Sequence, residues 1–236
     1  MTRAGRERRP RRLRSPARAC EHPGVNADLI ADLVAFWLSD SRDGPDRALA
    51  RHDWWYEGGP AVDDAIRVRF GDLVPRACAR ELMGWRNTPD GALALVLLLD
   101  QFTRNLHRGR AEAYAGDPCA FEVVNHAIDR GLDRSLHPVV RIWLYHPFHH
   151  REDVAEQDRG LGLLRVLRQQ ADPAWHAYVE RSIAGWTRHR DVVARFGRFP
   201  HRNAVLGRDS TTEELAHLAA DGRRFGQGLP ANDAAG

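Results

Sequence analysis

Apolar residues recur along most of this chain at steps of three and four, the spacing that places side chains on one face of an α-helix. The first such segment begins at Asn26, and the second covers residues 62–74. The stretch between them, residues 43–60, is rich in turn-forming residues. Helical spacing then continues in residues 138–145, 153–169 and 173–196. The pattern predicts amphipathic helices joined by short loops.

The segment from Gly91 to Leu99 differs from the others because it is apolar on every face. A helix of this kind is buried on all sides, and the continuation of the segment through Asn105 favours a helix over a strand. We therefore predict that residues 91–105 form the central helix of the core.

Capping residues mark two further helices. Asp117 and Pro118 are typical of an N-cap followed by the first helical position, and Gly131 is typical of a C-terminal cap. Two overlapping capping boxes, Ser210 with Glu213 and Thr211 with Glu214, predict a last helix that runs toward Phe225.

No segment shows the period-two alternation of a strand, so the predicted fold class is all-α, with antiparallel helical hairpins in a bundle or superhelix. The predicted organisation is a disordered arginine-rich extension at 1–24, a single helical domain at 25–228 and a frayed tail at 229–236.

The composition excludes several functions. All 35 basic residues are arginine, so mechanisms that need a lysine, such as a phosphate-binding loop or a pyridoxal Schiff base, are absent. Eight arginines lie within residues 1–20, so we expect no nucleic-acid contact outside this tail. Three widely spaced cysteines and the lack of a membrane-length apolar run predict a cytoplasmic protein.

Three polar clusters carry the candidate chemistry. The first follows the central apolar run: Asp100, Gln101, Arg104 and Asn105 share a helix face. An Asp100–Arg104 ion pair that only specifies packing explains this cluster as well as a functional role does.

The second cluster surrounds His150. This histidine would share a face with Asp153 and Gln157 if a helix began near Phe148, and Glu152 adds another carboxylate. Histidine beside carboxylate can form a general base with its orienting group, although inert loop histidines are common.

The third cluster is a loop in which arginines gather. Arg198, His201, Arg202 and Asn203 lie within six residues, and arginine side chains arranged in this way can hold a carboxylate or a phosphate. Arginine side chains that bind helix-terminal carbonyls would give the same pattern.

At these clusters the chain resembles domain-of-unknown-function family 924. The resemblance rests on FWL at 36–38, GALALVLLLDQFTRN at 91–105 and FGRFPHRN at 196–203, and it extends from about residue 28 to 225. It implies a bacterial, tetratricopeptide-like helical fold. The sequence departs from the family at His146, His149 and Arg151, where the family has Met, Glu and Ser. A catalytic or ligating role of that glutamate would therefore be lost or altered here.

Two functions remain open. The first is binding or enzymatic conversion of a small anionic molecule, with Asp100, His150 and His201 as acid–base candidates. Its predicted ligand-binding residues are Gln101, Arg104, Asn105, Glu152, Asp153, Arg198, Arg202 and Asn203. The second is a helical-repeat module that binds a peptide or protein partner.

A metal-dependent variant would use His150, Asp153, His189 and His201, but their spacing matches no known ligand pattern, so we predict no metal and assign no cofactor. We predict that Asp100, Arg104, His150 and the Arg198–Asn203 loop meet in one polar site. This convergence would favour the small-molecule function, whereas an aromatic groove away from the clusters would favour a partner.

Overall fold

The structure of the protein, a computed structural model, describes residues 23–221. Pro23 already belongs to the first helix, so the last two residues of the predicted 1–24 extension are helical. The remainder of that extension and the predicted tail at 229–236 lie outside the described residues, as does the expected continuation of the last helix to Phe225.

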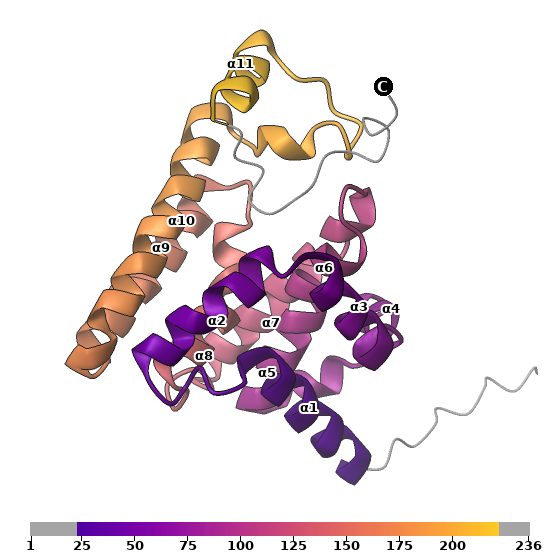
Figure 1. Cartoon of the computed structure of the whole chain (residues 1–236), viewed down its shortest axis with the longest axis vertical. Helices are drawn as coiled ribbons and strands as arrows, with labels where there is room; N and C mark the ends of the chain where they lie inside the picture. Colours follow the sequence, from indigo (N-terminus) through magenta and orange to yellow (C-terminus); the bar gives the residue numbers. More distant parts are fainter. Residues whose placement is uncertain (1–22, 222–236) are drawn as a thin grey trace, which may run out of the picture.

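The described chain is built of helices and contains no strand between residues 23 and 221, which confirms the all-α class (Figure 1). The α-helices are α1 (Pro23–Leu38), α2 (Pro45–Glu57), α3 (Gly59–Phe70), α4 (Leu73–Cys78), α5 (Pro89–Val96), α6 (Thr103–Leu106), α7 (Asp117–Asp129), α8 (Pro138–His149), α9 (Val154–Gln170), α10 (His176–Phe196) and α11 (Thr212–Asp221). Short 3-10 segments are η1 (Met83–Asn87), η3 (Ala111–Tyr114), η4 (Pro173–Trp175) and η5 (Pro200–Arg202).

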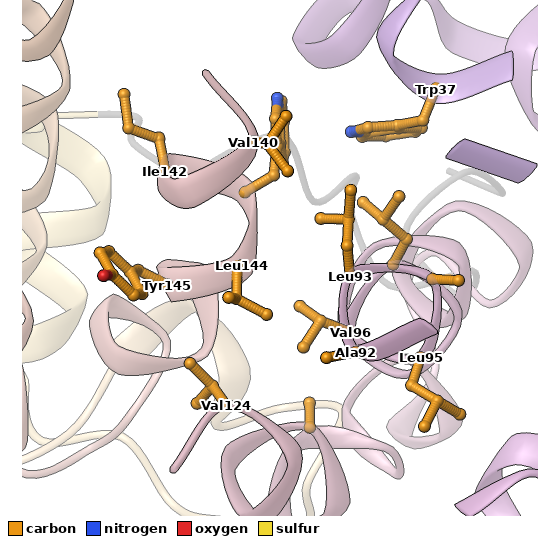
Figure 2. Packing of buried hydrophobic residues seen from close by; sticks show 14 of the residues in the cluster. Trp37, Ala92, Leu93, Leu95, Val96, Val124, Val140, Ile142, Leu144 and Tyr145 are labelled. Carbon is orange, nitrogen blue, oxygen red and sulfur yellow. The ribbon is translucent and has the colours of Figure 1, made fainter. Parts of the chain in front are cut away.

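The predicted central helix is the core of the molecule. Thr88 caps α5 by accepting a hydrogen bond from the Gly91 amide at 3.2 Å, and every residue from Gly91 to Asn105 is buried. Figure 2 shows Leu93 and Val96 of this helix packed among side chains of α1, α7 and α8. Complete burial explains why the segment needs apolar residues on all sides.

This helix widens into a π-helix, η2 (Leu97–Phe102), before it continues as α6. π-Helical turns are rare and are often found at functional sites. The wide turn contains Asp100 and Gln101, the first two residues of the polar cluster predicted from the sequence.

Helices α8, α9 and α10 pack against one another in chain order, and the short connection through η4 makes α9 and α10 antiparallel (Figure 1). Gly160 of α9 lies against α8 and α10: a Cβ atom there would meet the Phe148 Cβ at 2.5 Å and the Trp186 Cζ3 at 3.2 Å. The close approach of these helices therefore requires a residue without a side chain at this position.

One sequence prediction is wrong between residues 43 and 60, where the structure has helix α2 instead of a turn-rich connection. Gly44, Gly58 and Pro60 only flank this helix, and Pro45 occupies its first position. Ala48 and Trp55 are its only buried residues, so the helix has almost no apolar face to detect.

The condition for a face shared by His150, Asp153 and Gln157, a helix that begins near Phe148, is not met. Helix α8 extends to His149 despite Pro147, and α9 begins only at Val154. Asp153 caps α9 by accepting hydrogen bonds from the amides of Ala155 at 2.9 Å and Glu156 at 3.1 Å. His150 and Asp153 therefore do not share a helix face.

Asp117 does not act as the predicted N-cap of α7. The cap position belongs to Gly116, and Asp117 is the first helical residue. Its carboxylate contacts arginines of other elements, as described below. At the other end of α7, Gly131 adopts the left-handed conformation (φ 66°) expected of a residue that ends a helix.

None of the helices within residues 23–221 has both the length and the hydropathy of a membrane span. The tetratricopeptide-like superhelix implied by the family resemblance remains a prediction.

Candidate functional site

The polar end of the central helix faces a partly enclosed cavity of about 600 Å³. The cavity lies among α2, η2 with α6, α8, α10 and η5, and a volume of this size suits a small molecule. Its most prominent lining residues are aromatic or basic: Trp55, Tyr56, Arg104, Arg108, Tyr114, Trp143, His146, His149, His150, Tyr178, Arg181, Trp186, Arg188, His189, His201 and Arg202.

The central helix, α8 and α10 supply most of the cavity wall. The central helix contributes Gln101, Arg104 and Asn105, and Arg108 follows in the turn after it. Helix α8 contributes residues from Ile142 to His149 at three- and four-residue steps, and His150 caps its C-terminus. Helix α10 presents the stripe Tyr178, Arg181, Ser182, Gly185, Arg188 and His189. The cavity therefore depends on the tertiary packing of three helix faces.

Asp100 lies at the base of the site and is completely buried. Its Oδ1 accepts a hydrogen bond from His150 Nδ1 at 2.7 Å and forms an ion pair with Arg104 Nη1 at 3.0 Å. Its Oδ2 accepts a hydrogen bond from the Gln101 side-chain amide. One carboxylate thus fixes three neighbouring polar side chains, as a buried charge requires.

His150 has the arrangement of a general base. Because its Nδ1–H donates to Asp100, the tautomer with an unprotonated Nε2 is favoured, and the ring lines the cavity. Burial lowers the pKa of His150 well below its usual range, and the nearby guanidinium of Arg104 lowers it further. At neutral pH the ring is neutral and can accept a proton through Nε2.

Arg104 and Arg202 share a second carboxylate, that of the partly buried Asp117. Arg104 Nη2 donates to Asp117 Oδ2 at 3.0 Å, whereas Arg202 Nη1 lies 3.6 Å from the same oxygen. Both guanidinium groups also lie over the Tyr114 ring. Burial raises the pKa of Asp117 and lowers that of Arg202, so both charges are in an unfavourable environment.

Arg202 is the less well paired of the two arginines. Its side chain is 8 % exposed, and its Nε has no hydrogen-bond partner within the described chain. Buried guanidinium groups are usually fully hydrogen-bonded. The lining of the cavity therefore contains a cation with unused donor capacity.

Four further imidazoles surround His150. The His146 ring stacks on Trp143 and the His149 ring on Trp186, with centroid separations of 4.1 and 4.5 Å. Burial lowers the pKa of both His146 and His189 to about 4, and it lowers that of His149 well below its usual range. Burial, together with Arg202, lowers the pKa of His201 to about 2. These rings are neutral at pH 7.

The cavity is electropositive. Its lining residues within the described chain include five arginines and no carboxylate, and five of its histidines are held neutral. The carboxylates of Asp63, Asp100 and Asp117 lie behind the arginines that they pair with. A cavity of this kind attracts anions.

The structure brings Asp100, Gln101, Arg104, Asn105, His150, His201 and Arg202 together at or directly behind the cavity. It does not bring the other four predicted residues there. Glu152 accepts hydrogen bonds from the Phe199 amide at 2.8 Å and from Arg208, and Asp153 caps α9.

Arg198 and Asn203 fasten α11 to the loop that carries Arg202. Both side chains donate to Glu214, which also accepts a hydrogen bond from the Thr211 amide in the predicted capping box. These contacts hold the side chains of Arg198 and Asn203 outside the cavity, so ligand binding by these two residues, or by Glu152 and Asp153, would need a rearrangement.

Two of the three departures from the family pattern, His146 and His149, lie in the cavity wall. The third, Arg151, lies over the Phe121 ring at 4.8 Å, and Phe121 does not line the cavity. His146 and His149 therefore add two neutral imidazoles to the cavity wall.

The metal hypothesis has no support from the geometry. Within the described residues, no three histidine, cysteine or acidic side chains are arranged to hold a metal ion. Of the four residues that the hypothesis used, Asp153 is a helix cap, and the Nδ1 of His189 contacts the Gly185 carbonyl oxygen at 3.1 Å.

A second hollow, of about 830 Å³, lies beside the N-terminus of α8. Its buried Arg141 forms an ion pair with Asp133 at 3.6 Å and donates hydrogen bonds to Tyr145 and Gln170. Because this cation is well paired, we assign the candidate site to the cavity that contains Arg202.

Sequence reasoning missed Asp117, Tyr114 and the α10 residues Arg181 and Arg188. Tyr178, Arg181, Gly185 and Arg188 recur at helical steps, but the same spacing is typical of an ordinary exposed helix face. Asp117 could not be found, because an aspartate before a proline is typical of an N-cap.

This protein is all-helical, and it has a cavity lined by arginine and histidine at the polar end of a buried helix. The chain belongs to the family described as "Bacterial protein of unknown function (DUF924)", which matches residues 33–222.

One solved structure is similar to this chain. The protein of unknown function ATU0120 from Agrobacterium tumefaciens is 40% identical, with a TM-score of 0.65, over 82% of this chain and 98% of that chain. No match is found among curated proteins.

Proposed function

We propose that the cavity binds a small anionic molecule. The observation that carries the proposal is the buried guanidinium of Arg202, which lines the cavity and within the described chain has only a long ion pair, 3.6 Å from Nη1 to Asp117 Oδ2, to compensate its charge. An anionic group at this position would complete the hydrogen bonding of Arg202 and offset the desolvation of its charge.

The convergence of the polar clusters also favours this function over a partner-binding module. Arg104, His150 and Arg202 line one partly enclosed cavity, instead of three separate helix ends. Small-molecule sites are concave and combine aromatic walls with a few converging polar groups. Trp143, Trp186 and Tyr178 supply such walls here.

Removal of Arg202 should abolish anion binding. We expect benzoate, succinate or inorganic phosphate to change the fluorescence of the cavity tryptophans in the wild-type protein, and Arg202→Ala to lose this response. The variant should keep its stability within about 1 kcal/mol, because removing Arg202 also removes the cost of burying its charge, and Asp117 keeps Arg104 as its partner. Urea unfolding of the same samples measures that quantity.

Arg165→Ala is the matched control, because Arg165 is exposed on α9 and does not line the cavity. It should bind like the wild type. A loss of about 3–5 kcal/mol in Arg202→Ala would instead identify a structural ion pair. Absence of a response to all three anions would reject binding of these anions.

The contact between His150 and Asp100 favours a second function, in which the bound molecule is also converted. Nε2 of His150 would accept a proton from the substrate, while Asp100 orients the ring and stabilises the imidazolium that forms. The guanidinium groups of Arg104 and Arg202 would stabilise negative charge that develops on the substrate. The cofactor requirement is unassigned.

His150→Asn tests the catalytic function, because the asparagine amide can still donate to Asp100 but cannot accept the proton. We expect the wild-type protein to change the amount of at least one anionic metabolite in a cell extract, measured by mass spectrometry. The variant should slow this change by about 100-fold or more while still binding anions. Equal conversion by both proteins, or none by either, would reject the role.

A further inference from the structure

We infer that the ligand of this cavity carries two separated anionic groups, one bound at Arg202 and the other at Arg181. This inference rests on the proposed function and specifies the class of ligand. It combines the charge balance of the cavity with the positions of its arginines along α10.

The charge balance leaves two arginines without a counterion. Three cavity arginines are paired. Arg104 and Arg202 share Asp117, and Arg104 also contacts Asp100. Arg108 contacts Asp63 at 2.7 Å. Within the described chain, no carboxylate lies within ion-pair distance of Arg181 or Arg188.

A set of five arginines paired with three carboxylates has an excess of two positive charges. The histidines with lowered pKa add no charge at pH 7. Arg181 and Arg188 are exposed, so water screens part of their charge. A dianion would still match the excess of two charges better than a monoanion would.

The two ends of the cavity lie at different levels of α10. Arg202 lies over the Phe199 ring, and that ring is 5.9 Å from His189, which places Arg202 near the His189 level of the helix. Arg181 is eight residues earlier, a rise of about 12 Å. It lies near Tyr56 and Tyr178, whose ionisation it influences.

Apolar and aromatic groups occupy the space between these levels. Trp186 and Trp143 form walls there, and Gly185 leaves room because a Cβ atom at this position would meet only the end of Arg188, at 3.7 Å. Such a lining suits an elongated ligand with a flat or apolar middle and an anionic group at each end. Aromatic dicarboxylates have this chemistry.

Terephthalate and its monoamide, 4-carbamoylbenzoate, test the inference, because they have the same shape but differ by one charge. Calorimetric titration of the full-length protein in a buffer without phosphate or sulfate should show terephthalate binding about ten-fold more tightly or better. One charge-assisted hydrogen bond accounts for a factor of this size. Arg181→Gln should remove the preference, and Arg165→Gln should retain it.

Three other outcomes would contradict the second anionic group, the separation of the two groups, or anion binding itself. Equal affinity for terephthalate and its monoamide would reject the second anionic group while leaving anion binding intact. Phenyl phosphate carries both charges on one group. The second contrary outcome is that phenyl phosphate binds as tightly as terephthalate, with Arg181→Gln changing the affinity for neither ligand. In that case both negative charges are bound at one place, and the inference of two separated anionic groups is wrong. If neither benzoate nor any dianion binds, the proposed function fails as well.

Discussion

Acidification from pH 7.5 to pH 5 is expected to destabilise the folded protein strongly, because burial holds five cavity imidazoles in the neutral form. In an unfolded chain each would have a pKa of about 6.5. In the folded protein the pKa of His146 and of His189 is about 4, and that of His201 is about 2. The pKa values of His149 and His150 are also lowered.

The sign of the effect follows from proton binding. As the pH falls below about 6.5, the unfolded chain takes up protons that the folded protein does not bind. The contribution of the buried imidazoles to the free energy of unfolding is therefore fully present above this pH. It decreases as the pH falls to about 4, where His146 is protonated in the folded protein as well. At pH 5 one imidazole shifted like His146 lowers it by about 2 kcal/mol. Several such groups remove a large part of a typical stability of about 5–15 kcal/mol.

Urea unfolding followed by tryptophan fluorescence at several pH values measures this decrease. The carboxylates with lowered pKa, Glu122, Glu152 and Glu214, contribute mainly below about pH 5. The raised pKa of Asp117 acts in the opposite direction, so a net loss of stability between pH 7.5 and pH 5 comes from the imidazoles. His146→Met should reduce the loss by about 2 kcal/mol, because it removes one titrating group and keeps an apolar side chain of similar size. A wild-type stability that does not change between pH 7.5 and pH 5 would contradict the prediction.

The helices were predictable wherever apolar side chains determine the packing. The segment from Gly91 to Asn105 is apolar over most of its length, and burial on all sides is the physical reason. Helix α2 was missed because only Ala48 and Trp55 are buried in it, so tertiary contacts hold a segment with little pattern of its own. The π-helical turn at Leu97–Phe102 was not expected, because the residues of this turn fit an α-helix equally well.

The candidate site was predictable in part. Asp100, Arg104 and Arg202 could be found because charged groups next to buried apolar segments need partners, and nearby complementary groups supply them. Arg181 and Arg188 could not be distinguished from an ordinary exposed helix face, since both are exposed and no sequence rule places α10 against α2. Glu152 and Arg198 were predicted to bind a ligand, but they pair with Arg208 and Glu214 and hold the loop in place. The sequence does not show these partners, because they lie apart from Glu152 and Arg198 along the chain.

Replacement of Asp100 by alanine should lower the free energy of unfolding by about 3–5 kcal/mol, the range for breaking a buried ion pair. The substitution removes the acceptor of His150 and of Gln101, and it leaves Arg104 buried with Asp117 as its remaining carboxylate. Asp117 already serves Arg202 as well, so it cannot compensate two guanidinium charges. The loss combines an uncompensated charge with two unsatisfied donors.

Two further variants separate charge from shape. Asp100→Asn keeps one oxygen acceptor but removes the negative charge and adds a donor, so it should lose less stability, about 1–3 kcal/mol. Asp64→Ala is the surface control: Asp64 is 70% exposed in its pair with Arg67, and its loss should change stability by less than about 0.5 kcal/mol. Urea unfolding at pH 7.5 gives all three values. Loss of Asp100 from a buried network must lower the free energy of unfolding, because Arg104 and His150 stay in the folded protein without their partner. If Asp100→Ala and Asp64→Ala had the same free energy of unfolding, Asp100 would therefore not hold the buried network together.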